Sequence, residues 1–102
     1  MTSKTDVVIE EKIKVDAVYP KMYHVIFLND DVTPMELVTD ILVAIFKHNP
    51  ESAKEVTLEI HNKGRGIAGT YSYEVAEQLS IEATRIARNN GSPLRIQIDE
   101  AD

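Results

Sequence analysis

The C-terminal third of the chain places a long amphipathic helix directly before an alternating strand. Ser72 can cap the helix, apolar side chains then recur at helical spacing over 73–90, and Asn90-Gly91 ends the pattern. Residues 94–98, Leu-Arg-Ile-Gln-Ile, alternate apolar and polar side chains and predict a strand. Because an amphipathic helix needs a partner for its apolar face, this pair predicts a mixed domain. The helix residues expected to face inward are Val75, Ala76, Leu79, Ala83, Ile86 and Ala87.

An earlier strand and helix complete one side of such a domain. Aromatic and branched residues predict a strand over 23–28. Apolar residues at helical spacing predict a helix over 34–48. Thr33 and Glu36 have the spacing of a capping box, with Pro34 at the first helical position, so the helix is expected to begin there.

The stretch 51–63, after Asn49-Pro50, carries two overlapping patterns. Its apolar residues fit one face of a helix, and those between 56 and 60 also alternate as in a strand. Its Glu and Lys residues favour the helix, and a short strand follows at 67–71. The expected fold class is therefore α+β in the order β-α-α-β-α-β: a small three-stranded antiparallel sheet with three helices packed on one face.

The length of 102 residues fits one domain, expected at 22–102, preceded by a flexible N-terminal extension at 1–21. The extension mixes a few Val and Ile residues with many charged ones, so burial offsets little of the entropy lost on ordering it. The alternative is that residues 7–15, whose apolar side chains mostly share a parity, pair as an edge strand.

The charge balance and the absence of cysteine exclude several classes of function. The net charge of −6, from 11 basic and 17 acidic residues, disfavours binding to nucleic acid or to acidic membranes. A chain without cysteine has no disulfides, no cysteine zinc site and no thiol catalysis. The longest apolar run, 41–46, is too short to span a membrane, and the N-terminus has no signal-peptide pattern, so a cytoplasmic location is expected.

Residues 64–69, Gly-Arg-Gly-Ile-Ala-Gly, match the G-x-G-x-x-G pattern of dinucleotide-binding turns. Such a turn joins a strand to a helix and brings the phosphates to the helix N-terminus. Here three residues separate Gly69 from the predicted helix, and only one βαβ unit would fit after it. We therefore expect Gly64 to end the preceding helix and the other glycines to shape a turn or tight strand. Nucleotide binding through Gly64, Gly66 and Gly69 is the alternative.

Asn29, Asp30 and Asp31 place three oxygen-bearing side chains between a strand end and a helix start. Turn formation and capping account for such residues, but two adjacent carboxylates exceed what a turn needs, so a cationic ligand is the functional interpretation. No Asp-x-Asp-x-Asp-Gly calcium loop is present, and neither His24 nor His48 has the partner spacing of a metal site. No metal, no cofactor and no enzymatic activity are expected, since no nucleophile or base motif accompanies the carboxylates.

Over about residues 22–100 the sequence resembles the ClpS family of protease adaptors. The family has three strands and three helices, in agreement with the order derived above. The matching stretches are Met22-Tyr23-His24-Val25-Ile26, Leu28-Asn29-Asp30-Asp31, Thr33-Pro34-Met35-Glu36, Ile60-His61, the glycine segment 64–69, Glu74-Val75-Ala76-Glu77 and Pro93-Leu94.

The resemblance implies an adaptor that binds proteins by a bulky apolar N-terminal residue (Leu, Phe, Tyr or Trp) and hands them to a ClpA- or ClpC-type AAA+ unfoldase. A free α-amino group is mostly cationic at neutral pH and offers three donors, which Asn29, Asp30 and His61 would recognise. Asp31 and Thr33 would support the turn and the peptide unit that follows. The residues that match the family's side-chain pocket are Thr33, Met35, Val38, Thr57, Ile60 and Leu94.

Three further features follow from the resemblance. Glu74 matches a position that contacts the N-terminal domain of the unfoldase, whereas Leu79 replaces a basic residue often found shortly after it. The extension at 1–21 would reach toward the unfoldase channel. Thr57 stands where many family members carry Met, which implies a broader or shifted choice of first residue.

The implied adaptor is a monomer that binds no nucleic acid and no membrane. A competing interpretation is a factor-docking module like the C-terminal domain of the bacterial ribosomal stalk protein, which has the same fold. That interpretation predicts a basic helix face, and this chain has no Lys-rich one.

Overall fold

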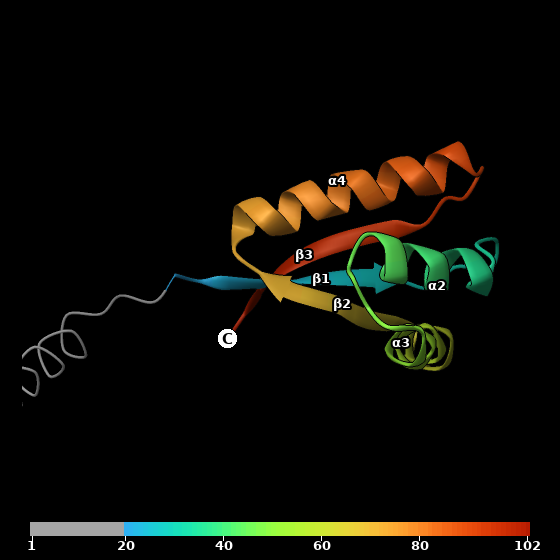
Figure 1. Cartoon of the computed structure of the whole chain (residues 1–102), viewed down its shortest axis with the longest axis horizontal. Coiled ribbons are helices and arrows are strands. Elements are labelled where there is room, and N and C mark those ends of the chain that lie inside the picture. Colours follow the sequence, from blue (N-terminus) through green and yellow to red (C-terminus); the bar gives the residue numbers. More distant parts are fainter. Residues whose placement is uncertain (1–19) are drawn as a thin grey trace, which may run out of the picture.

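The computed structural model of the protein describes residues 20–102 (Figure 1). The expected N-terminal extension, 1–21, lies outside this range except for its last two residues. The alternative edge strand at 7–15 lies wholly outside it. The element order confirms the predicted β-α-α-β-α-β arrangement and the α+β class. The elements are β1 (Met22–Leu28), α2 (Met35–Ala44), α3 (Pro50–Lys63), β2 (Arg65–Tyr71), α4 (Tyr73–Asn89) and β3 (Arg95–Ala101).

The three strands form one antiparallel sheet in the order β2-β1-β3, so β1 is central. Helix α4 runs along the sheet, and α2 and α3 pack against each other at the end where β1 finishes (Figure 1). Val25 and Phe27 of β1 are fully buried in the core. The core as a whole consists of Val25, Phe27, Val38, Ile41, Leu42, Phe46, Ala53, Ile60, Ala68, Ala76, Ala83, Ala87 and Leu94.

Strand pairing lengthens two strands beyond their sequence patterns. β2 begins at Arg65, which pairs with Leu28, and β3 continues to Ala101, which pairs with Met22. The register of β1 and β2 shifts between Val25 and Ile26. Backbone hydrogen bonds to a central strand stabilise flanking residues whose own side chains show no alternation. The alternating patterns in the sequence are therefore shorter than the two strands.

The predicted capping box of the first helix is wrong. The N-cap residue of α2 is Pro34, with no side-chain cap, and the N–H groups of Leu37 and Val38 donate to the Pro34 carbonyl. The Thr33 hydroxyl is not free to cap, because it bonds to Asp30 and to Ser92 instead. The helix also ends at Ala44 rather than at 48.

One residue predicted to face inward on the last helix is exposed. Val75 is 45% exposed, whereas the buried stripe of α4 runs through Ala76, Ser80, Ala83 and Ala87. Val75 lies one residue, about 100° around the helix, from that stripe. The small residues of the stripe let α4 lie close to the sheet.

Two positions of the G-x-G-x-x-G segment require glycine, each for a different structural reason. Gly64 has a φ of 90° and ends α3 in the left-handed conformation that favours glycine. At Gly66 an added Cβ would lie 2.8 Å from the Ile60 side chain, so close packing of α3 on β2 requires glycine. The segment therefore joins a helix to a strand, and the nucleotide-binding alternative, which needs a strand followed by a helix, is wrong.

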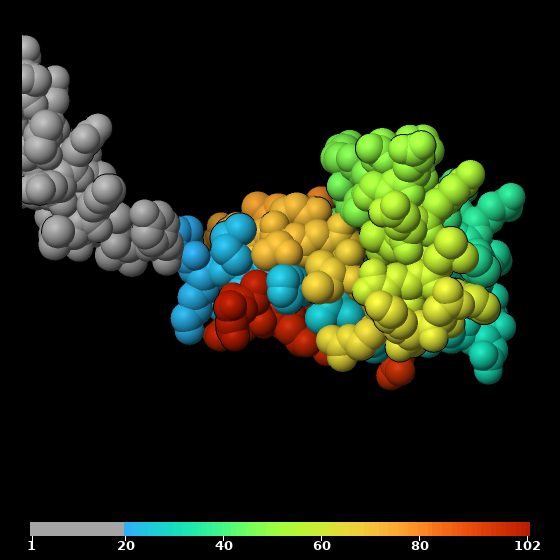
Figure 2. All heavy atoms as spheres, turned by 90° about the horizontal axis from the view of Figure 1, so that it is seen from below, coloured from blue at the N-terminus to red at the C-terminus, as the bar shows by residue number. Residues whose placement is uncertain are grey.

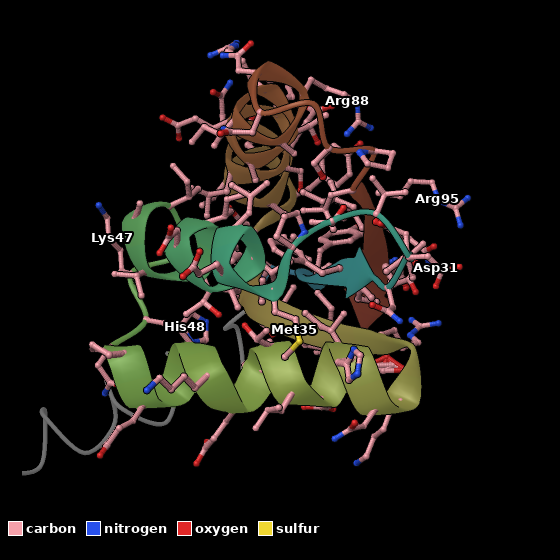
Figure 3. All side chains as sticks on the ribbon, turned by 90° about the vertical axis from the view of Figure 1, so that its right-hand side faces the viewer. Asp31, Met35, Lys47, His48, Arg88 and Arg95 are labelled. Carbon is pink, nitrogen blue, oxygen red and sulfur yellow. The ribbon has the colours of Figure 1, made fainter. Side chains whose placement is uncertain are left out.

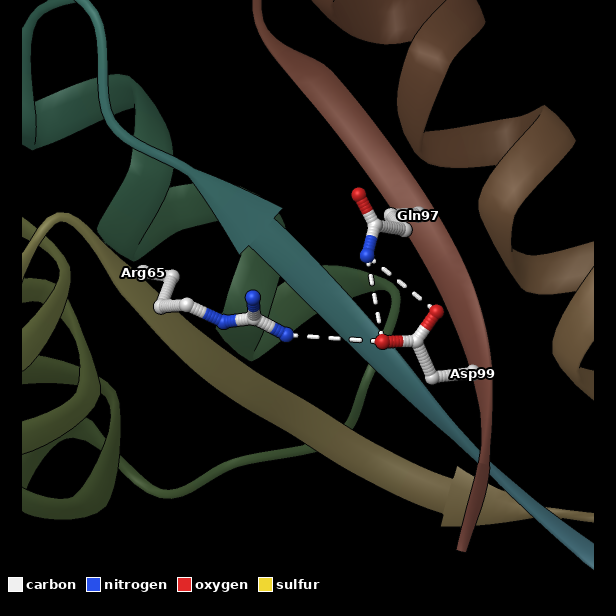
Figure 4. A network of polar contacts seen from close by, with 3 residues as sticks. All are labelled: Arg65, Gln97 and Asp99. Carbon is white, nitrogen blue, oxygen red and sulfur yellow. Dashed lines mark hydrogen bonds and ion pairs between the residues drawn. The ribbon is translucent and has the colours of Figure 1, made fainter.

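The face of the sheet away from the helices carries a small polar network (Figure 4). Arg65 Nη2 on β2 lies 3.4 Å from Asp99 Oδ2 on β3, across the central strand. Gln97 Nε2 donates to both oxygens of the same carboxylate at 3.1 Å. Both charged groups are exposed, so the pair contributes little to the free energy of unfolding.

Candidate functional site

A pocket lies at the end of the central strand, where the loop after β1 meets α2, α3 and the segment that leads into β3. The Asn29 N–H donates to the Gly64 carbonyl at 2.9 Å, and this hydrogen bond ties the loop to the end of α3. Nine of its ten lining residues are those expected from the sequence, and the tenth is Leu28. The lining consists of Leu28, Asn29, Asp30, Thr33, Met35, Val38, Thr57, Ile60, His61 and Leu94.

The carboxylate of Asp30 organises the loop. Its Oδ1 accepts hydrogen bonds from the Val32 N–H at 2.8 Å and the Thr33 N–H at 2.6 Å, and its Oδ2 accepts from the Thr33 hydroxyl at 2.8 Å. Burial by itself raises the pKa of Asp30, but these hydrogen bonds and the charge of Arg95 together lower it below the ordinary value of 3.8. The group is therefore a carboxylate at neutral pH.

Sequence reasoning missed Ser92, which holds this loop from behind. Its side chain is buried, its Oγ lies 2.6 Å from the Thr33 Oγ, and it accepts a hydrogen bond from the Leu94 N–H at 3.1 Å. Arg88 donates to the carbonyls of Ser92 and Leu94, both at 2.9 Å, and so fixes the segment before β3. A buried hydroxyl needs a partner, but nothing in the local sequence indicates which one.

The mouth of the pocket is polar and open to solvent. Asn29 and His61 are exposed, and Asp30 is partly buried. Helix α3 brings His61 to the same side as Ile60 and Thr57, because residues three and four apart share a helical face. Within residues 20–102, no hydrogen bond occupies the His61 ring. An amide, a carboxylate and an imidazole thus converge on one opening with unused acceptor capacity.

The interior of the pocket is apolar and tight. Val38, Ile60 and Leu94 are buried at 5%, 3% and 1% exposure. The cavity inside has a volume of only about 10 Å³. Met35 is 42% exposed and lies between α2 and α3 (Figure 3). A bulky ligand group needs a lining side chain to move, and methionine is the most adaptable of them.

Asp31, expected to support the turn, and Glu74, expected to contact the unfoldase, both lie away from the pocket. Asp31 is exposed and points outward (Figure 3), and the turn support expected of it is provided by Asp30. Glu74 is exposed in the first turn of α4, which begins at the end of the sheet opposite the pocket loop (Figure 1).

Two kinds of site are absent from the described part of the chain. No group of three or more His, Asp or Glu side chains there is placed to hold a metal ion. Among helices of residues 20–102, none has both the length and the apolar character needed to cross a membrane.

In this small α+β domain, a pocket that is polar at its mouth and apolar inside suits the recognition of a ligand with a charged and an apolar group. Comparisons with known proteins agree. The family described as ATP-dependent Clp protease adaptor protein ClpS matches residues 18–97. A ClpS of Shewanella halifaxensis is 42% identical over 93 residues, 91% of each chain. A ClpS of Sodalis glossinidius is 43% identical over 93 residues, 90% of this chain and 87% of its own.

A solved structure of Agrobacterium tumefaciens ClpS2, bound to L-phenylalaninamide, has a TM-score of 0.78 and 32% identity, and the match covers 81% of this chain and all of the other. The chain belongs to the ClpS family. It is accordingly an adaptor of a Clp protease and not an enzyme.

Proposed function

We propose that this adaptor binds proteins by a free N-terminal residue with a bulky apolar side chain (Leu, Phe, Tyr or Trp) and delivers them to a ClpA- or ClpC-type unfoldase. The observation that carries the proposal is the convergence of Asn29, Asp30 and His61 at the mouth of an apolar pocket. A cationic amine with three donors fits three acceptors, whereas an internal peptide N–H has one donor and no charge.

The ionised state of Asp30 supports amine binding. Its carboxylate accepts three hydrogen bonds from the loop and retains lone-pair capacity on Oδ2, where one bond is made. A charge-assisted hydrogen bond to an ammonium contributes about 1.5–3 kcal/mol. The loop hydrogen bonds hold the carboxylate in one orientation, so little entropy is lost when the amine arrives.

The apolar interior supports selection of the first side chain. Its walls combine Val38, Thr57, Ile60 and Leu94, with Met35 at the edge. Burying a Leu or Phe side chain contributes about 1.5–3 kcal/mol. Together with the amine contacts and less the cost of association, these contributions correspond to micromolar binding, about −8 kcal/mol.

The related Agrobacterium structure supports the same ligand chemistry. The L-phenylalaninamide bound to that ClpS2 has a free α-amino group and a phenyl side chain, and its amide stands in for the first peptide bond of a substrate. It is therefore the smallest mimic of a chain that begins with Phe.

Delivery is proposed to use surfaces outside the pocket. Glu74, exposed in the first turn of α4, would contact the unfoldase N-terminal domain, with Leu79 in place of a basic residue. The extension at 1–21 would engage the unfoldase, while 22–102 forms the adaptor core and acts as a monomer. Separation of Glu74 from the pocket would leave the substrate and the unfoldase free to bind together.

The direct test is titration of a fluorescent peptide that begins with Leu or Phe against the full chain. We expect micromolar binding, and no binding of the same peptide after acetylation of its α-amino group. Equal affinity for the free and the acetylated peptide would contradict amine recognition.

A further inference from the structure

The hydroxyl groups of Thr39 and Thr57 meet beside the pocket. Their oxygens lie 2.8 Å apart and join α2 to α3. Thr57 is 4% exposed and lines both the pocket and a neighbouring groove between the two helices, and Thr39 lines that groove. In the space-filling view, α3 covers the end of the molecule next to the loop after β1 (Figure 2). The hydroxyl pair thus stands at the boundary of two hollows.

The pair has fewer protons than hydrogen-bond contacts. Thr57 Oγ1 lies 2.8 Å from the Ala53 carbonyl, and Thr39 Oγ1 lies 3.0 Å from the Met35 carbonyl. With the contact between the two oxygens, three contacts share the two hydroxyl protons. Every proton is therefore already used inside the protein, while at least three of the four lone pairs remain available. Such a pair can accept a hydrogen bond from a ligand but has none to donate.

The pair also lies at a suitable distance from the mouth of the pocket. Thr57 and His61 are one turn apart on the same face of α3, which separates them by about 6 Å along the helix axis. An aromatic side chain has a comparable length. A first residue whose amine meets His61 and whose ring follows α3 would bring the far edge of the ring to Thr57. The groove beyond, about 330 Å³, gives a large ring room to extend.

We propose, building on the function proposed above, that the Thr39–Thr57 hydroxyl pair selects first residues whose ring carries a hydrogen-bond donor, namely Tyr and Trp, over Phe. The phenol O–H or the indole N–H would donate to a free lone pair of Thr57 Oγ1, the oxygen of the pair that belongs to a pocket-lining residue. A Phe ring has no donor, so it forms no hydrogen bond with this oxygen and leaves no buried donor without a partner. A Phe-initiated peptide therefore binds more weakly than a Tyr- or Trp-initiated one but is not excluded. A neutral hydrogen bond corresponds to about a fivefold change in affinity.

The test compares peptides that differ only at the ring of the first residue, measured on the full chain. Thr57→Val keeps the shape of the side chain and removes its hydroxyl, and Thr57→Ser keeps the hydroxyl. We expect the ratio of Tyr to Phe affinity to fall about fivefold in Thr57→Val and to keep its wild-type value in Thr57→Ser. An unchanged ratio in a Thr57→Val protein that still binds the Phe peptide would overturn the selection and leave the proposed function standing. Failure of the wild type to bind either peptide would overturn the proposed function itself.

A second comparison can be decided on the wild-type protein alone. Trp and 1-methyltryptophan share a ring system, but only Trp has the N–H donor. We expect the wild type to bind the Trp peptide about fivefold more tightly, and Thr57→Val to reduce this difference. Equal affinities on the wild type would overturn the inference even if Thr57→Val does not fold.

Discussion

The hydroxyl oxygens of Thr33 and Ser92 lie 2.6 Å apart and connect the loop after β1 to the segment before β3. Their neighbours determine which one donates. Thr33 gives its proton to Asp30 Oδ2, and Ser92 accepts from the Leu94 N–H, so the Ser92 proton goes to Thr33. Three donors in series thus point toward the carboxylate proposed to bind the amine, which makes Ser92 a positioning residue for Asp30.

Replacing Ser92 by Ala removes the middle of this series. The Leu94 N–H and the Thr33 oxygen lose a buried partner, so we expect the free energy of unfolding to fall by about 1–3 kcal/mol. Affinity for a Leu-initiated peptide should also fall severalfold, because Asp30 is less firmly held. Urea unfolding and peptide titration measure the two effects. Ser92→Thr, which keeps the hydroxyl, is the control, and wild-type affinity in the Ala variant would show that Ser92 serves the fold alone.

Replacing His61 and Asp30 in turn should distinguish an effect on peptide binding alone from an effect on both binding and stability. His61 is exposed and Asp30 accepts three hydrogen bonds from its own loop. We expect His61→Ala and Asp30→Ala each to reduce peptide affinity at least tenfold, and only Asp30→Ala to lower the melting temperature. A wild-type dissociation constant in His61→Ala would show that His61 takes no part in peptide binding.

The lowered pKa of Asp30 makes stability dependent on acidic pH. The folded state holds this proton less tightly than the unfolded state, in which the ordinary value of 3.8 applies. The contribution of Asp30 to stability is therefore complete above about pH 5 and is lost as the pH falls through the folded pKa. We expect Asp30→Asn to show a smaller loss of unfolding free energy than the wild type between about pH 5 and pH 3. Parallel curves for the two proteins would rule out this linkage.

Deletion of residues 1–20 should separate binding from delivery. All pocket residues lie between 28 and 94, so peptide affinity is expected to stay unchanged. Degradation of a Leu-initiated reporter by the reconstituted unfoldase and protease should stop. The control is a reporter that the protease degrades without an adaptor, and normal degradation of the Leu reporter by the truncated chain would contradict the role proposed for the extension.

Thr57→Met should narrow the choice of first residue. The longer Met side chain would fill space that Thr57 leaves for the branched side chains of Ile or Val. We expect Ile- and Val-initiated peptides to bind severalfold more weakly to this variant, with little change for Leu, since one methylene corresponds to about 1 kcal/mol. An identical ranking of the peptides on both proteins would show that Thr57 does not set this preference.

Local patterns in the sequence were sufficient for the elements and their order. The helical spacing in 73–90 and the alternation in 94–98 each arise from one periodic contact with a core, so a single segment reveals them. Gly64 likewise ends α3 as predicted, because the left-handed conformation is a local property of the backbone. The block from Asn29 to Glu36 also indicated the family, which the comparisons show.

Tertiary structure alone decided which polar groups pair. The Thr33 hydroxyl follows a capping pattern in the sequence but bonds to Asp30 and to Ser92, 59 residues away. Thr39 and Thr57 become partners only when α2 and α3 pack together. A hydroxyl bonds whichever group the fold places within about 3 Å, and a distance of that kind between remote segments leaves no periodic trace in either one. The sequence by itself therefore determined the framework of this adaptor, and the packing of its helices and loops determined the chemistry of the pocket.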